Sequence, residues 1–153
     1  MTKSKLQNPK VGIIIGSQSD IPIIEKTTSV LMDLGIDYEL TVASAHRTPK
    51  QVEQFAKTAE NKFDVIIAGA GMAAALPGVV AAHTTIPVIG LPISSKALSG
   101  HDALFSIVQM PSGVPVACVA IDGARNAAIL AAQIMSLKYP KLRNELKKLK
   151  RKK

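Results

Sequence analysis

Three short segments carry the side chains that could perform chemistry, and the most informative spans residues 44–49, Ser-Ala-His-Arg-Thr-Pro. It places a hydroxyl, an imidazole and a guanidinium in one turn. An arginine can grip a phosphate through two parallel hydrogen bonds, and a histidine can exchange protons near neutral pH. Core packing does not explain the adjacent pair His46 and Arg47, although a plain surface loop is the alternative. The segment indicates phosphate binding combined with proton transfer.

A second segment, residues 16–20, reads Gly-Ser-Gln-Ser-Asp and stands ahead of an expected helix. Hydroxyls and backbone N–H groups at a helix start form a natural phosphate site. The segment is not a P-loop, because no Gly-Lys-Ser/Thr follows. The alternative interpretation is a plain helix cap made by Ser19 or Asp20.

A third segment, Gly69–Ala74, matches the dinucleotide fingerprint G-x-G-x-x-A at the expected start of a helix. That fingerprint should follow the first strand and be followed by an acid at the end of the next strand. Here the next expected strand ends at Leu91-Pro92. The glycines are better interpreted as letting the backbone approach a ligand or another helix closely.

The other titratable residues indicate less chemistry. His83 is expected to cap a helix or lie on the surface, and His101 to line a pocket or pair with Asp102. Cys118 lies within an apolar run and is expected to be an inert buried thiol. A single cysteine excludes an internal disulfide and a cysteine-based zinc site, and no cluster has metal-ligand spacing.

The elements that must position these segments follow from short apolar runs alternating with helical patterns. Strands are expected at Val11–Ile15, Tyr38–Ala43, Val65–Ala68, Pro87–Leu91 and Val116–Ile121. Helices are expected near 22–34, 49–61, 73–82, 104–109 and 124–137, and after Pro140. Thr48 and Gln51 have the spacing of a capping box.

This order predicts an α/β fold with a parallel sheet of about five strands and helices on both faces. The strands lack polar alternation, as expected when both faces are buried. Such sheets bind ligands beyond the carboxyl ends of their strands, where the strand order reverses. The loops after the first three strands are therefore the expected site.

Length and composition set the class of protein. With 153 residues, 47% hydrophobic and 20% charged, the chain fits one globular domain and excludes disordered and fibrous proteins. The net charge of +8 arises from the two ends of the chain. Residues 138–153 carry nine basic residues and one acidic residue, whereas residues 11–137 carry seven basic and ten acidic residues. We expect a polar extension over 1–10, a catalytic domain over 11–137 and a basic C-terminal helix or tail over 138–153.

The basic tail has one aromatic residue, Tyr139, and places Leu142, Leu146 and Leu149 on one face. Nucleic-acid surfaces normally interleave basic with aromatic or hydrogen-bonding residues, so a solvated tail is expected and no nucleic-acid partner. The uncharged stretch 65–95 is broken by glycines and prolines and reads as strand, turn, helix and strand. With no targeting segment visible, we expect a cytoplasmic protein without a membrane partner.

Taken together, the segments resemble the N5-carboxyaminoimidazole ribonucleotide mutases of purine biosynthesis over roughly residues 11–137. The matching segments are Gly16–Asp20, Ser44–Pro49, Ile67–Gly71, Leu76–Gly78, Pro87–Pro92, Ser106–Pro111, Gly113–Ala117 and Asn126–Ala128. The resemblance implies a flavodoxin-like three-layer subunit assembled as a homo-octamer. It also implies conversion of the substrate's carbamate into a ring carboxylate at C4, without a cofactor or metal.

The resemblance further implies roles for individual residues. Ser17, Ser44 and Arg47 would lie near the phosphate of the ribonucleotide substrate. Asp20 would bind the ribose, and His46 would transfer protons. The segment Ala70, Gly71, Met72 and Ala73, with Leu76, would lie along the imidazole and the migrating carboxyl group.

The resemblance departs at Ala75, where bacterial mutases usually have histidine. A related carboxylase branch, which uses free carbon dioxide, has lysine in place of Arg47 and a different third loop. Because this chain keeps Arg47 and the Ala-Gly-Ala-Gly turn, the resemblance is to the mutase branch. Two alternatives belong to other classes. A non-catalytic nucleotide-binding module would bind the aminoimidazole ribonucleotide without turnover, and a dinucleotide oxidoreductase would need the missing acid after the fourth strand.

Overall fold

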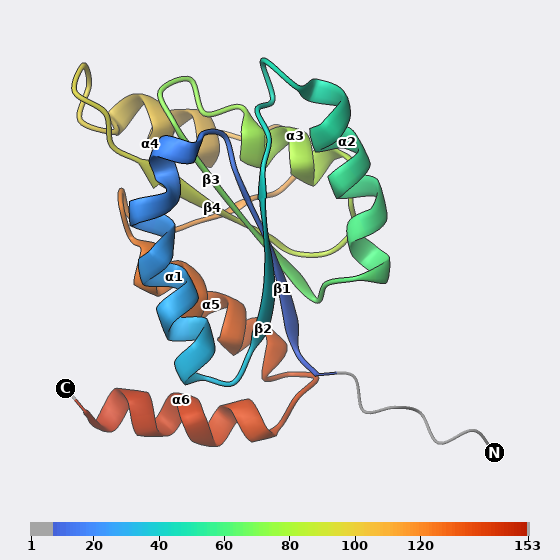
Figure 1. The fold of residues 1–153 in the computed structure, drawn as a ribbon, viewed down its shortest axis with the longest axis vertical. Coiled ribbons are helices and arrows are strands. Elements are labelled where there is room, and N and C mark those ends of the chain that lie inside the picture. The colour runs from blue at the N-terminus through green and yellow to red at the C-terminus, as the bar shows by residue number, and fades with distance from the viewer. Residues whose placement is uncertain (1–7, 153) are drawn as a thin grey trace.

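Five strands form one sheet in the order β2-β1-β3-β4-β5, and every neighbouring pair is parallel (Figure 1). The computed structural model describes residues 8–152. The strands are β1 (Lys10–Ile15), β2 (Asp37–Val42), β3 (Val65–Gly71), β4 (Val88–Ile93) and β5 (Ala117–Cys118). The chain leaves β1 in one direction to β2 and then crosses back to β3, so the order reverses between β1 and β3. This is the flavodoxin-like arrangement, and the predicted fold class is confirmed.

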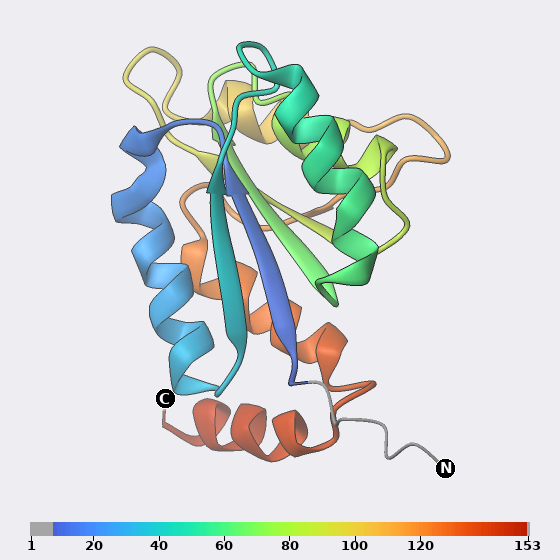
Figure 2. The ribbon, with the colours of Figure 1, turned by 45° about the vertical axis from the view of Figure 1, so that its right-hand side comes forward.

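Helices cover both faces of the sheet (Figures 1 and 2). The helices are α1 (Ile21–Asp33), α2 (Pro49–Thr58), α3 (Leu76–Ala82), α4 (His101–Val108), α5 (Ala124–Met135) and α6 (Lys141–Arg151). Alternate side chains of a strand point to opposite faces. Ile13 and Ile15 accordingly pack with α1 and α5, whereas Ile14 packs with α2, α3 and α4. Within residues 8–152, no helix is long and apolar enough to cross a bilayer.

Two strands differ from the sequence prediction. β2 lies at the sheet edge, where Leu40 and Val42 are exposed, so the expectation that every strand is buried on both faces is wrong for it. β5 has two residues instead of the expected six. Beyond it the chain still follows β4, since Val119 N donates to Gly90 O at 3.2 Å and Asp122 N to Pro92 O at 2.8 Å.

Two helix starts and one helix cap also differ from the predictions. The helix expected over 73–82 begins at Leu76, because β3 continues through Gly71. The helix expected around 104–109 begins earlier, at His101. The capping box does not form, because Thr48 directs its hydroxyl to the preceding turn and makes no cap hydrogen bond to α2.

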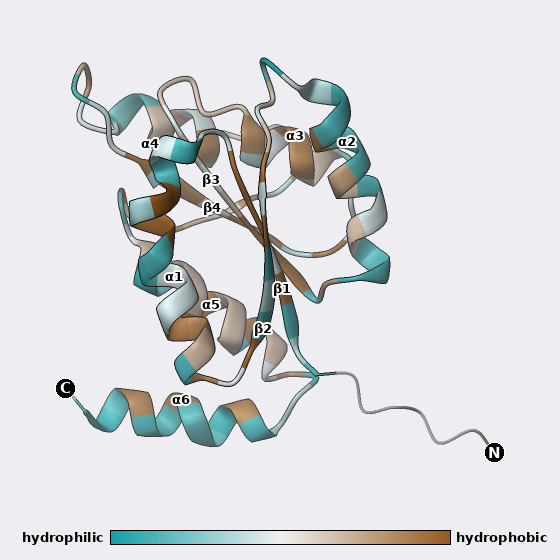
Figure 3. Cartoon of the chain, viewed as in Figure 1, coloured by the Kyte–Doolittle hydropathy of each residue, from teal (hydrophilic) through white to brown (hydrophobic). Residues whose placement is uncertain are grey.

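The C-terminal helix is confirmed, but its apolar face is not solvated. Leu142 and Leu146 are buried in the same core as α1 and α5, while the rest of α6 is mostly hydrophilic (Figure 3). Asp64 anchors the preceding segment, accepting hydrogen bonds from Lys138 Nζ at 2.8 Å and from Tyr139 Oη at 3.1 Å. At the other end, residues 1–7 of the expected polar extension lie outside the described residues, and Lys10 already begins β1.

The burial of Leu142 gives a direct test of this packing. Leu142→Ala removes a side chain that is 1% exposed and should lower the free energy of unfolding by about 2–4 kcal/mol. Leu137→Ala, at a residue that is 78% exposed, should change it by less than about 0.5 kcal/mol. Chemical denaturation measures both values, and equal effects would contradict the packing of α6.

Candidate functional site

Four loops meet at the carboxyl edge of the sheet and enclose a cleft of about 500 Å³. They follow β1, β2, β3 and β4 and lie together above the strand ends in Figure 1. The cleft is lined by Gly16, Ser17, Ser19, Asp20, Ser44, Ala45, His46, Arg47, Ala70, Gly71, Met72, Ala73, Ala74, Ala75, Leu76, Ile93, Ser94 and Ser95. All ten residues predicted for the site from the sequence are therefore brought to one place.

The loop after β1 is closed by Ser17. Its Oγ accepts a hydrogen bond from Ser19 N at 3.2 Å and lies 2.9 Å from Ser19 Oγ, capping a short 3-10 turn over Gln18–Asp20. The expected cap made by Ser19 or Asp20 is therefore wrong: the Asp20 side chain makes no cap hydrogen bond to α1. Its carboxyl group stays available to the cleft.

Partial burial shapes the electrostatics of Asp20. Loss of solvent raises the pKa of the Asp20 carboxyl above its usual value, and a hydrogen bond from the Ser17 backbone acts in the opposite direction. A ligand hydroxyl that donates a hydrogen bond to this carboxylate would favour its charged form. Asp20 is thus suited to bind a neutral donor such as a sugar hydroxyl.

The loop after β2 is organised by Ser44. Its Oγ accepts hydrogen bonds from the backbone N–H groups of His46 at 3.3 Å and Arg47 at 3.1 Å. Thr48 Oγ1 closes the same turn, accepting from Ser44 N at 2.9 Å and donating to Ser44 O at 3.2 Å. The Thr48 hydroxyl, which does not cap α2, therefore stabilises the turn that carries His46 and Arg47.

The side chains of His46 and Arg47 are exposed at the cleft. The ion pairs and side-chain hydrogen bonds found within residues 8–152 involve neither the imidazole nor the guanidinium. Arg47 consequently keeps its donors for an anionic ligand. His46 can take or give a proton without breaking an existing contact.

The loop after β3 forms a wall of small residues. Gly71 lies close to β4: a Cβ there would be 3.1 Å from the carbonyl oxygen of Ile93, so a larger residue would require a small shift of one of the two strands. Met72 adopts a left-handed φ of +57° and is 65% exposed. Ala74 and Leu76 are buried behind it, and Ala75 lines the cleft. This wall is apolar, in contrast to the polar loops after β1 and β2.

Sequence reasoning missed the end of β4 and the loop after it, which contribute Ile93, Ser94 and Ser95 to the cleft. The signal was available: β4 was expected to be parallel, so its carboxyl end had to lie at the same edge. By contrast, His83 and His101 are exposed and do not line the cleft; His101 Nδ1 lies 2.9 Å from Leu98 O.

Cys118 is half-buried rather than fully buried, and burial raises the pKa of its thiol. A raised pKa keeps the thiol protonated and unreactive. Among residues 8–152, no group of three or more His, Cys, Asp or Glu side chains could hold a metal ion.

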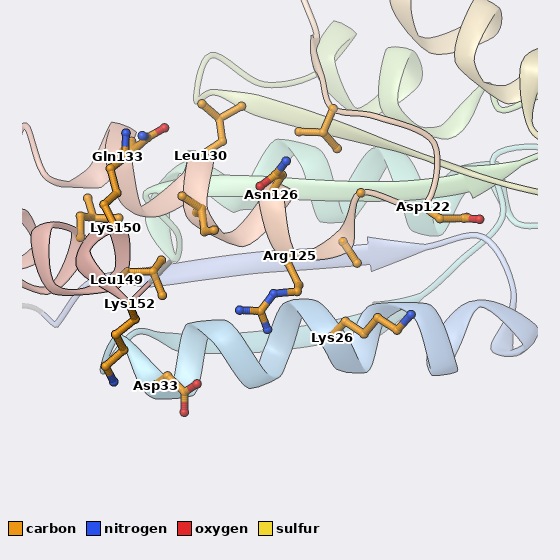
Figure 4. Close-up of a pocket in the computed structure, with 15 residues that line it drawn as sticks. Lys26, Asp33, Asp122, Arg125, Asn126, Leu130, Gln133, Leu149, Lys150 and Lys152 are labelled. Atoms are coloured by element: carbon orange, nitrogen blue, oxygen red, sulfur yellow. The ribbon is translucent and has the colours of Figure 1, made fainter.

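A larger groove of about 930 Å³ lies between α1, α5 and α6 (Figure 4). Its lining combines apolar Ile129, Leu130 and Leu149 with basic Lys26 and Arg125. None of the site residues expected from the sequence lines it. Size alone therefore does not identify the functional site.

Comparison with known proteins gives one consistent result. The model of a family described as AIR carboxylase matches residues 10–153. The N5-carboxyaminoimidazole ribonucleotide mutase of Pyrococcus abyssi is 60% identical over 145 residues, which cover 94% of this chain and 83% of the relative. The mutase of Thermotoga maritima is 55% identical over 143 residues, which cover 93% of this chain and 84% of the relative. The crystal structure of Treponema denticola PurE superposes with a TM-score of 0.86 and 34% sequence identity. The match covers 95% of this chain and 91% of the PurE chain.

The raised pKa of Asp20 predicts a pH-dependent effect on stability. A carboxyl with a raised folded-state pKa favours folding at low pH and loses that contribution as pH rises through this pKa. Asp20→Asn removes the cost of the half-buried charge, so the Tm should rise by about 1–2 °C at pH 7 and be unchanged at about pH 3.

Asp37→Asn is the matched control, because Asp37 is exposed at the start of β2. Thermal unfolding followed by circular dichroism at the two pH values measures both variants. A lower Tm for Asp20→Asn at pH 7 would contradict the account of this carboxyl.

Proposed function

The chain belongs to the AIR carboxylase family, and we propose that its cleft is the place where N5-carboxyaminoimidazole ribonucleotide becomes 4-carboxy-5-aminoimidazole ribonucleotide. The reaction itself, an isomerisation in purine biosynthesis, is the one performed by mutases that match nearly the whole chain. The observation that supports the location is the meeting of ten residues from three separate loops in one cleft.

The phosphate of the substrate fits the loops after β1 and β2. Arg47 offers free guanidinium donors, which can contact two phosphate oxygens at once. Ser44 Oγ already accepts from two N–H groups, so its own proton is available to donate. Ser17 lines the same cleft from the first loop, and Asp20 in that loop would accept a hydrogen bond from a ribose hydroxyl.

The imidazole then extends toward the wall formed by Ala70, Gly71, Met72 and Ala73, with Leu76 behind it. Breaking the carbamate C–N bond releases carbon dioxide, and C4 of the ring attacks it to form the new C–C bond. One proton is added to the exocyclic nitrogen and one is removed from C4, so the rearrangement balances without another reactant. A small apolar wall favours retention of carbon dioxide and exclusion of water.

His46 is the group proposed to move both protons. It is carried by the turn next to Arg47, and its imidazole has no competing partner among the described residues. In its protonated form the imidazole can donate a proton to the exocyclic nitrogen as carbon dioxide leaves. It then accepts the proton released from C4, which restores its starting state within one reaction cycle. Proton transfer and phosphate binding are therefore assigned to adjacent residues, which makes them separable by mutation.

An assay from two starting materials tests the function. Formation of the C4 carboxylate is followed by ultraviolet absorbance or NMR, once from the N-carboxylated substrate and once from aminoimidazole ribonucleotide plus bicarbonate. We expect efficient turnover from the first. Preferred turnover from the second would identify a carboxylase, and binding without turnover would identify a nucleotide-binding module.

Substitutions within the 44–49 turn should separate binding from chemistry. Arg47→Ala should raise KM by weakening binding by about 2–4 kcal/mol, because the phosphate loses a charge-assisted contact. His46→Asn keeps a hydrogen-bonding group but cannot cycle a proton, so kcat should fall at least about 10²-fold while substrate still binds. Steady-state kinetics with a binding isotherm measures both, and near-normal kcat in His46→Asn would refute its role.

We also propose a homo-oligomer, with the octamer as its form, and a cytoplasmic location. Exposed apolar side chains support assembly: Leu98, Phe105 and Val108 lie on α4 and the turn before it. The groove beside α5 adds partly buried Ile129 and Leu130. The helix α3 gives less support, because it buries Leu76, Pro77 and Val80 within its own subunit. A cytoplasmic location fits a small phosphorylated substrate.

Light scattering coupled to size exclusion tests the assembly. At micromolar concentration, the mass should be about eight times the 16.2 kDa of the chain. A monomer of 16.2 kDa under these conditions would show that the exposed apolar residues do not mediate self-association.

A further inference from the structure

We propose that Asp122 is a positioning residue for the cleft, which fixes the Ser94–Ser95 wall so that Ser95 faces the reacting half of the substrate. The inference rests on the proposed use of the cleft. It assigns a role to the loops after β4 and β5. The family resemblance implies no site residue in either loop.

The contact between Asp122 and Ser94 uses both carboxylate oxygens. Oδ1 accepts from Ser94 N at 2.9 Å, and Oδ2 accepts from Ser94 Oγ at 2.5 Å, across 28 residues of chain. In addition, Asp122 N donates to Pro92 O at 2.8 Å. One residue thus joins the loop after β5 to the end of β4 through three hydrogen bonds.

The backbone of Asp122 is held in an uncommon conformation. Its φ is +55°, in the left-handed region that favours glycine. Glycine stands at the very next position, Gly123, yet the left-handed residue is the aspartate. A strained non-glycine residue persists where its surroundings require its side chain, and here the side chain makes the two bonds to Ser94.

Ser94 is confined from its other side by Gly100. Gly100 has a φ of +88°, and a Cβ there would lie 3.1 Å from Ser94 Cα and 2.6 Å from Ile121 Cγ2. The turn 96–100 therefore folds back onto Ser94 without room for a side chain at position 100. Ser94 is fixed between Gly100 and the Asp122 carboxylate.

Ser95 is the residue that this arrangement presents to the cleft. Its Oγ is shielded from solvent and has no hydrogen-bond partner within the described part of the chain. Buried hydroxyls are normally paired, so this one is suited to a ligand atom that it reaches by rotating about its Cα–Cβ bond. Gly71 pairs with Ile93 in the sheet, which places Ser95 beside the wall proposed for the imidazole and the carboxyl group.

An ion pair in the larger groove is the alternative role for Asp122, which also lies at the end of that groove. Figure 4 shows its carboxylate pointing away from Arg125. The ion pairs within residues 8–152 do not include it. Its hydrogen bonds run instead to the cleft loop.

Kinetics of Asp122 variants in the full chain test the proposal. Asp122→Gly suits the left-handed backbone but removes both bonds to Ser94, so kcat should fall about tenfold or more with KM changed less than about threefold. Asp122→Asn keeps an oxygen for Ser94 N and an amide for Ser94 Oγ, and should retain kcat within about threefold. Wild-type kcat in Asp122→Gly, or equal losses in both variants, would overturn the proposal.

A double-mutant cycle with Ser95→Ala separates positioning from a general loss of structure. The double variant Asp122→Gly/Ser95→Ala should lose little more kcat than the worse single variant, because both changes remove the same contact. Fully additive losses would overturn the link to Ser95. Thermal unfolding of each variant shows whether the native fold is intact at the assay temperature.

Arg47→Ala and His46→Asn in the same assay distinguish this proposal from the proposed function. If both are impaired and Asp122→Gly is normal, the cleft is the site and the role of Asp122 is wrong. If all three are normal, the assignment of the cleft itself is wrong.

Discussion

Parallel strand direction is the constraint on which the rest of this structure depends. Because all five strands run the same way, the loops after β1, β2, β3 and β4 leave the sheet at one edge. The reversal of strand order between β1 and β3 sends the following segments to opposite sides and leaves a crevice between them. The cleft results from this topology, and short-range hydrogen bonds such as those of Ser17 and Ser44 then shape each loop.

The loops divide the cleft into two chemical halves. The first two loops carry hydroxyl, carboxyl, imidazole and guanidinium groups, whereas the third presents glycine and alanine with buried Leu76 behind them. A ribonucleotide with a phosphate at one end and an imidazole at the other matches this gradient. With His46 next to Arg47, the proposed proton transfer would take place at the polar side of the reacting ring, and Ser95 lines the cleft from the side of β4.

Much of this arrangement could be predicted from the sequence because its signals are local. Short apolar runs locate the strands, and the 44–49 turn concentrates functional side chains within a few residues. The features that were missed depend on distant partners. Thr48 satisfies Ser44 instead of capping α2, β2 lies at the edge of the sheet, and Asp122 bonds to Ser94 across 28 residues. The charge of α6 suggested a solvated tail, but Leu142 packs into the core.

A crystal structure of His46→Asn soaked with N5-carboxyaminoimidazole ribonucleotide tests the central claim most directly, because this variant should bind the substrate without converting it. The account predicts the substrate in the cleft, with its phosphate at Arg47 and Ser44 and its imidazole against Ala70–Leu76. Substrate bound in the larger groove between α1, α5 and α6, or bound in the cleft with its phosphate away from Arg47, would contradict it.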